Sequence, residues 1–199
     1  MKKNSRQKGK IINFLFLIVL GLFMGWVSAD LEGVKTADEI AGGLGIWIFV
    51  ISLAGIFSQS STESFLRGAL FILSSVTGFY GNRSITGTGK MFTDISAFLI
   101  VILIGGMLGF IAYHFKEKGW SGALCISVPL SLFLAEGYEI YSDSGFSVPL
   151  AVNLCGALIL VICFARGKHK KIKVLPLVIA FTFVLIYFDI IRKFFGGWI

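Results

Sequence analysis

The sequence predicts an all-α protein, a polytopic bundle of transmembrane helices that forms a single domain over residues 1–199. Composition is one reason: 56% of the residues are hydrophobic and 15% are charged, whereas soluble domains average about 45–50% and about 25%. The pattern is the second reason, because seven apolar stretches are suited to cross a bilayer as helices. These predicted spans are 11–29, 41–57, 65–80, 95–114, 119–137, 147–165 and 174–192.

The third reason is the placement of lysine and arginine on alternate sides of these spans. With the N-terminus in the cytoplasm, 13 of the 18 cations lie inside and 5 lie outside. The inner cations are Lys2, Lys3, Arg6, Lys8, Lys10, Arg67, Lys116, Lys118, Arg166, Lys168, Lys170, Lys171 and Lys173. An excess of cations in cytoplasmic loops follows the positive-inside rule. We therefore expect a cytoplasmic N-terminus and an outer C-terminus.

The first span, 11–29, has a rival interpretation as a secretory signal peptide. Basic residues precede it, and the small residues Val27-Ser28-Ala29 close it. However, its apolar run is longer than the ~7–15 residues of a signal core. Gly21 and Gly25 also form a GxxxG motif, which favours a helix that packs against another. We expect a retained helix; cleavage would leave six spans in the same orientation.

The third span, 65–80, is the weakest of the seven. It is short and contains Ser74, Ser75 and Thr77, so a re-entrant segment is the alternative. If it did not cross, the inside would hold 10 cations and the outside 8, and the basic loop 166–173 would face outward. The charge distribution therefore favours a crossing.

All three prolines fall in the last three spans. Pro129 interrupts the fifth, where Ser127 or Ser131 is expected to bond to the backbone that the proline frees. Pro149 and Pro176 lie in the first turns of the sixth and seventh, where proline is tolerated.

Several function classes are disfavoured. The net charge of +7 comes from short loops beside apolar runs, which indicates bilayer orientation rather than nucleic-acid binding. Cys125, Cys155 and Cys163 form no CxxC, so neither a disulfide framework nor a zinc site is indicated. The sequence contains no HExxH and no GxSxG motif. We expect no enzyme activity, catalytic residues, metal or cofactor.

Two carboxylates near the hydrocarbon define a candidate site, because such groups are costly there without a partner or a role. Glu136 ends the fifth span and has no cation three or four residues away. Asp189 is placed in the outer third of the seventh span, where pairing with Arg192 is the alternative to a functional role. A kinked fifth helix beside Asn153 and Gly156 of the sixth would open a small polar cavity toward the outside.

Two functions remain open. The first is a small transporter, or the substrate-binding subunit of one, whose outward-facing pocket takes a small cationic or proton-coupled solute. The predicted pocket residues are Glu136, Asn153, Asp189, Tyr80 and Tyr138. The second is a non-catalytic membrane scaffold or accessory subunit, whose glycine-rich helix faces pack against a membrane protein partner. Convergence of Glu136 and Asp189 in one cavity would favour transport.

Residues 105–137 carry a pattern of paired glycines, Gly105 and Gly106, then Gly109, a basic turn before Gly119-Trp120, and Ala135-Glu136-Gly137. This hairpin resembles a pattern in an uncharacterised family of small bacterial multi-pass membrane proteins. The resemblance covers under a fifth of the chain and implies no activity. It implies a multi-pass protein of the bacterial inner or plasma membrane, in contact with the lipid bilayer.

Overall fold

The computed structural model describes residues 2–31, 34, 36, 40, 41, 43–86, 95–164 and 168–191. These residues form seven α-helices and a short 3₁₀ turn, and they contain no strand. The elements are α1 (Lys2–Asp30), α3 (Leu44–Ile56), α4 (Ser61–Thr86), α5 (Ile95–Tyr113), η1 (His114–Lys116), α6 (Gly119–Ser144), α7 (Val148–Phe164) and α8 (Lys168–Tyr187). The predicted all-α transmembrane bundle is confirmed.

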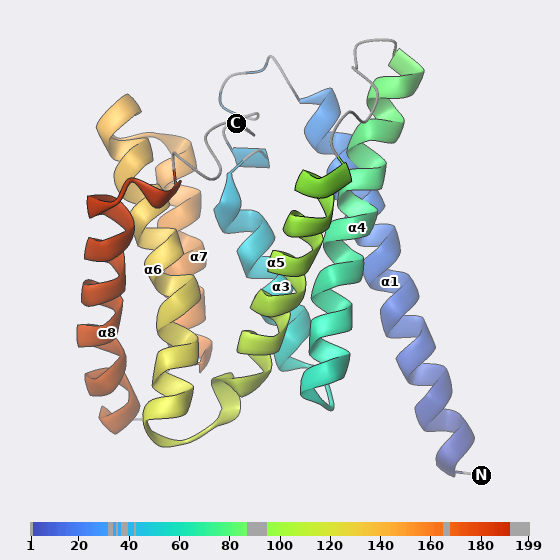
Figure 1. Ribbon diagram of the computed structural model, residues 1–199, viewed down its shortest axis with the longest axis horizontal. Coiled ribbons are helices and arrows are strands. Elements are labelled where there is room, and N and C mark those ends of the chain that lie inside the picture. Colours follow the sequence, from blue (N-terminus) through green and yellow to red (C-terminus); the bar gives the residue numbers. More distant parts are fainter. Residues whose placement is uncertain are drawn as a thin grey trace.

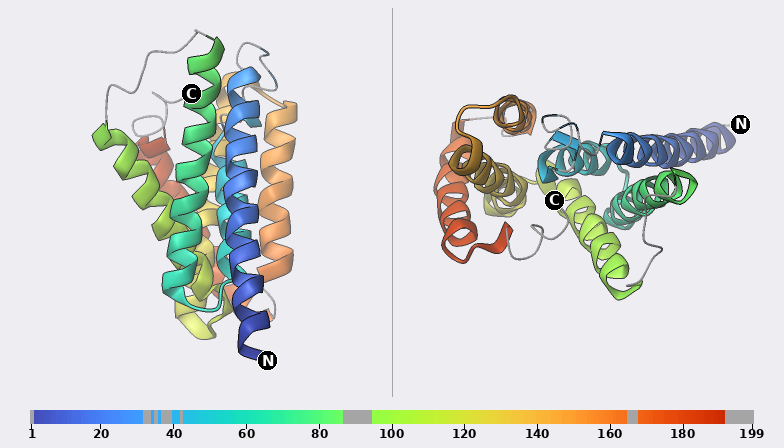
Figure 2. Two further views of the ribbon diagram at one scale, coloured as in Figure 1. Left: turned by 90° about the vertical axis from the view of Figure 1, so that its right-hand side faces the viewer. Right: turned by 90° about the horizontal axis from the view of Figure 1, so that it is seen from above.

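The helices form two groups, one on each side of α3 (Figure 1). In the first group α1 packs on α4, and α4 packs on α5; in the second, α6 packs on both α7 and α8. Helix α3 contacts α4, α5, α6 and α7 and so lies between the groups, and α5 and η1 also contact α6. Viewed from above, α1 and α8 lie at opposite margins of the bundle (Figure 2).

Apolar side chains cover the outside of the bundle, and many polar ones are inside. Phe183 on α8 is 65% exposed and Phe23 on α1 is 64% exposed, a surface that suits lipid rather than water. Three helical segments of the described chain are long and apolar enough to cross a membrane: Ile11–Asp30, Phe98–Lys116 and Gly119–Ser144. Buried polar and charged residues are Ser28, Ser52, Ser58, Glu63, Ser64, Arg67, Ser74, Ser75, Asn82, Ser127, Ser131, Glu136 and Asn153.

Helix α4 contains the third predicted span, for which a re-entrant segment was the alternative. The predicted stretch 65–80 is the middle of one continuous helix of 26 residues, which does not turn back as a re-entrant segment would. Of the polar residues in this stretch, Arg67, Ser74 and Ser75 are buried, whereas Thr77 is exposed and its hydroxyl donates to the carbonyl of Leu73. Arg67 in particular, counted above among the inner cations, is 4% exposed. Its guanidinium lies 2.6 Å from the Glu63 carboxylate and over the ring of Phe14 on α1.

Glycines bring the first group of helices into backbone contact. A Cβ atom added at Gly25 of α1 would lie 1.8 Å from the carbonyl oxygen of Ser75 on α4. A Cβ at Gly68 of α4 would lie 2.2 Å from the carbonyl oxygen of Gly105 on α5. The helices can approach this closely because glycine has no side chain. The expectation that Gly21 and Gly25 pack against another helix is confirmed, and that helix belongs to the same chain.

The turn between α5 and α6 is fastened by polar contacts. Lys116 donates a hydrogen bond to the carbonyl of Ser58, at the end of α3, over 3.0 Å. Glu117 accepts a hydrogen bond from Ser121 and lies 2.5 Å from Nδ1 of His114. The pKa of the Glu117 carboxyl is lowered, mainly by the hydrogen bond from the Ser121 hydroxyl and to a smaller extent by His114.

Two expectations about the last helices need correction. Helix α6 continues through Pro129, but Ser127 and Ser131 bond to the carbonyls of Leu124 and Val128, not to that of Cys125, which the proline frees. Helix α8 ends at Tyr187, five residues before the predicted end of the span. Asp189 therefore follows the helix in a turn, with φ 52°.

Candidate functional site

The first turn of α3 lacks a local cap. Its N-cap residue is Gly43, which has no side chain to accept a hydrogen bond from the first backbone amides of the helix. These amides point toward α6 and α7. A helix start carries partial positive charge as well as free donors, so the turn attracts an anionic group from another part of the chain.

Glu136 of α6 is that group. One carboxylate oxygen accepts a hydrogen bond from the backbone N–H of Leu44 over 2.5 Å. The other oxygen accepts a bond from Nδ2 of Asn153 on α7 over 2.7 Å. Glu136 is 4% exposed and Asn153 5% exposed. A buried carboxylate is thus held by donors from two other helices, which offsets part of its desolvation cost.

The hydrogen bond to Glu136 also fixes the orientation of the Asn153 side chain. A carboxylate accepts hydrogen bonds, so the amide must turn its NH₂ group toward Glu136 and its Oδ1 atom away. That oxygen is buried and has no hydrogen-bond partner. It lies on the side of Gly137, where an added Cβ atom would be 3.8 Å from it.

Two glycines make room for Glu136 and for the adjacent ring of Phe133. A Cβ atom at Gly45 would lie 3.0–3.1 Å from Phe133, Asn153 and Glu136 at once. A Cβ at Gly156 would lie 2.9 Å from the Phe133 ring. Phe133 is fully buried and cannot move aside cheaply. Both glycines are therefore needed for this arrangement.

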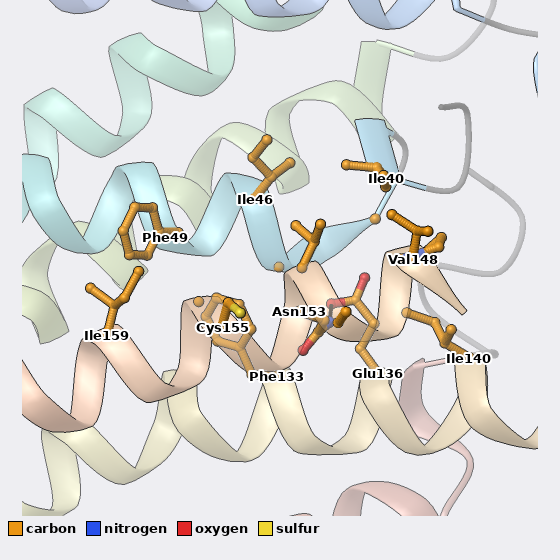
Figure 3. Close-up of a pocket in the computed structure, with 16 residues that line it drawn as sticks. Ile40, Ile46, Phe49, Phe133, Glu136, Ile140, Val148, Asn153, Cys155 and Ile159 are labelled. Carbon is orange, nitrogen blue, oxygen red and sulfur yellow. Dashed lines mark hydrogen bonds between the residues drawn. The ribbon is translucent and has the colours of Figure 1, made fainter. Parts of the chain in front are cut away.

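Beside Glu136 and Asn153 lies a pocket of about 430 Å³ between α3, α6 and α7 (Figure 3). Its size falls in the range of small-molecule sites. Glu136 is the single charged residue among those that line it, and most of the others are apolar. A small cavity beside Asn153 and Gly156 was predicted, but its walls are mainly apolar rather than polar.

The structure brings together two of the five predicted site residues, Glu136 and Asn153. The other three lie outside the described lining of the pocket. Tyr80 is on α4, with its ring against Phe79, and Tyr138 is half exposed on another face of α6. Asp189 lies beyond the end of α8 and is not among the described lining residues, so the convergence of Glu136 and Asp189 in one cavity, which would have favoured transport, is not found. Its expected partner, Arg192, is outside the described residues.

Sequence reasoning missed the contribution of α3. The signal was present, because Gly42-Gly43 precedes a strongly apolar helix at a position where Ser, Thr, Asp or Asn would normally cap it. A helix that starts in the bilayer without a capping side chain needs an acceptor from elsewhere. Glu136 is the acceptor that the fold supplies.

A model of a family of unknown function, DUF6518, matches residues 4–195. The chain belongs to this family. The DUF6518 match covers nearly the whole chain, far more than the hairpin 105–137, and it confirms the expectation of an uncharacterised family. No curated protein and no solved structure matches the chain.

The unpartnered oxygen of Asn153 leads to a stability prediction. In the Gly137→Ser variant the new Cβ fits at ordinary contact distance from Leu150 and Asn153, and the hydroxyl can donate to Asn153 Oδ1. We expect a gain of about 1 kcal/mol from the hydrogen bond, in addition to the higher helix propensity of serine. The Tm of the purified protein measures the change. Gly137→Ala is the control, and a serine variant no more stable than the alanine variant would contradict the prediction.

Proposed function

We propose that this membrane protein binds a small cationic solute at Glu136 and carries it across the bilayer, alone or as the substrate-binding subunit of a transporter. One observation supports the proposal above all: a buried carboxylate, fixed by α3 and by Asn153, stands at the wall of a pocket of ligand size. We further propose that the membrane is a bacterial inner or plasma membrane.

The charge of the pocket determines the class of solute. No basic side chain is among the described lining residues, so the negative charge of Glu136 is not neutralised by an ion pair there. Hydrogen bonds from neutral donors stabilise a carboxylate but leave its net charge. In a surrounding of low dielectric constant this charge favours the binding of a cation and strongly disfavours the binding of an anion.

A purely structural role for Glu136 is the competing explanation. A carboxylate that only capped α3 would need no cavity beside it, and α3, α6 and α7 would pack against its side chain directly. The scaffold alternative has less support. That alternative needs glycine faces free to meet a partner, but Gly21, Gly25, Gly68, Gly105 and Gly109 contact other helices of the same chain.

The test is ligand binding by the purified protein in lipid nanodiscs. Thermal-shift and calorimetric titrations with small organic and inorganic cations are expected to find at least one stabilising cation. Matched neutral and anionic compounds are expected to have no effect. The Glu136→Gln variant keeps the size of the side chain and removes its charge. We expect it to bind the cation at least about 10-fold more weakly, since a charge-assisted hydrogen bond is lost.

The control is Asp143→Asn on the same helix, because Asp143 does not line the pocket. This variant should bind the cation as the original chain does. If no cation stabilises the protein, or if Glu136→Gln binds it equally well, the proposal is overturned. Uptake of the cation into proteoliposomes then distinguishes a carrier from a binding subunit.

A further inference from the structure

The pocket has a polar end and an apolar end. Glu136 and Asn153 form the polar end, close to the starts of α3 and α7, where Ile40, Ile140 and Val148 also line the pocket (Figure 3). From there the lining follows Ile46 and Phe49 along α3, and Cys155 and Ile159 along α7 (Figure 3). Ile159 is six positions after Asn153, which corresponds to about 9 Å along the helix axis.

The apolar end opens on the flank of the bundle. Val152 and Ile159 line the pocket, and each is 43% exposed; Cys155 beside them is also exposed. The neighbouring residue Leu158 is 58% exposed and continues the apolar outer surface of α7. In a membrane protein such a surface faces lipid chains, so the groove between α3 and α7 is accessible from within the bilayer.

We propose that this groove takes a lipophilic ammonium, an alkyl or arylalkyl amine whose charged nitrogen bonds to Glu136 while its apolar chain lies between α3 and α7. The ligand enters sideways from the bilayer. This inference rests on the proposed function and makes the solute class more specific.

The residues that line the pocket suit an amine with an apolar body better than a metal ion or a strongly hydrated cation. Hard metal ions take several oxygen ligands, and the described residues contain no group of three that could hold a metal. A hydrated cation would exchange its water shell for two polar side chains and a wall of hydrocarbon. An amine with an apolar body instead retains a charge-assisted bond at one end and buries its chain at the other.

The experiment measures binding of three probes to nanodisc-embedded protein by equilibrium dialysis, with empty nanodiscs of the same lipid as the reference. Hexylammonium has both the head and the tail, methylammonium has the head, and hexanol has the tail. We expect hexylammonium to bind at least about 10-fold more tightly than either. Compared with methylammonium it buries more methylene groups, and compared with hexanol it adds a charge-assisted bond to Glu136.

Two tryptophan variants on α7 test the location of the chain. Val152→Trp fills the groove and should weaken hexylammonium binding at least about 10-fold. Leu158→Trp, on the same helix but outside the lining, should leave binding unchanged.

The outcomes separate the inference from the proposed function. If methylammonium binds as tightly as hexylammonium and Val152→Trp has no effect, a cation site exists but the lipophilic-amine inference is wrong. If hexanol binds as tightly as hexylammonium, the groove accepts any alkyl chain and the inference is again wrong. If neither these amines nor any other cation binds, the proposed function itself fails.

Discussion

Replacement of Gly68 by alanine is expected to destabilise the protein by about 3 kcal/mol, at the upper end of the range for overpacked cores. The added Cβ would lie 2.2 Å from the carbonyl oxygen of Gly105 and 3.0 Å from its carbon atom. Both are backbone atoms, so no side chain can rotate away to make room. Helices α4 and α5 must move apart instead. Thermal and denaturant unfolding in detergent micelles measures the loss.

Gly81→Ala is the matched control, because Gly81 belongs to the same helix and an added Cβ there meets nothing within 4 Å. This variant loses only the conformational freedom of glycine in a helix and should gain about 0.5–1 kcal/mol. If both alanine variants have the same stability, α4 and α5 are not in backbone contact and the packing described for this group is wrong.

The helices could be located from the sequence because lipid imposes a simple pattern on it. A crossing segment needs a long apolar run and satisfies its backbone internally. The ends of the predicted stretches 41–57 and 147–165 accordingly fall within one to three residues of the ends of α3 and α7. The errors lie where polar residues extend a helix beyond its apolar run. Helix α4 continues to Thr86 and α6 to Ser144, since their polar ends need no hydrocarbon around them.

The candidate site could be predicted only in part, for a related reason. Glu136 and Asn153 stand out as polar groups in apolar runs, and both are in the pocket. The partner of Glu136 on α3 is a backbone amide, which leaves no trace in side-chain chemistry. The pairing of Glu136 with α3 depends on which helices are neighbours, and periodicity carries no information about that. Asp189 was misplaced because the apolar run Val184–Phe188 continues past the last turn of α8.

Arg67→Met is expected to destabilise the protein by about 3–5 kcal/mol, the range for loss of one partner of a buried ion pair. The Arg67 guanidinium donates to Glu63 over 2.6 Å and to the carbonyl of Ala54 on α3 over 3.4 Å. Methionine retains most of the volume of the side chain but removes the ion pair of Arg67 with the Glu63 carboxylate, which is 7% exposed. Unfolding of the reconstituted protein measures the difference.

The double variant Glu63→Gln/Arg67→Met shows whether the loss comes from the broken ion pair between Glu63 and Arg67. Replacement of a whole buried pair by neutral groups is often neutral, so the double variant should recover most of the stability that Arg67→Met loses. If the double variant is as unstable as the single one, the bonds of Arg67 to Ala54 and its contact with Phe14 carry the stabilisation instead. The same comparison separates two roles of a cation in α4. If Arg67 served only to orient the protein in the membrane, Arg67→Met would change the topology and leave the stability unchanged. The buried ion pair instead predicts that Arg67→Met lowers the stability and keeps the topology.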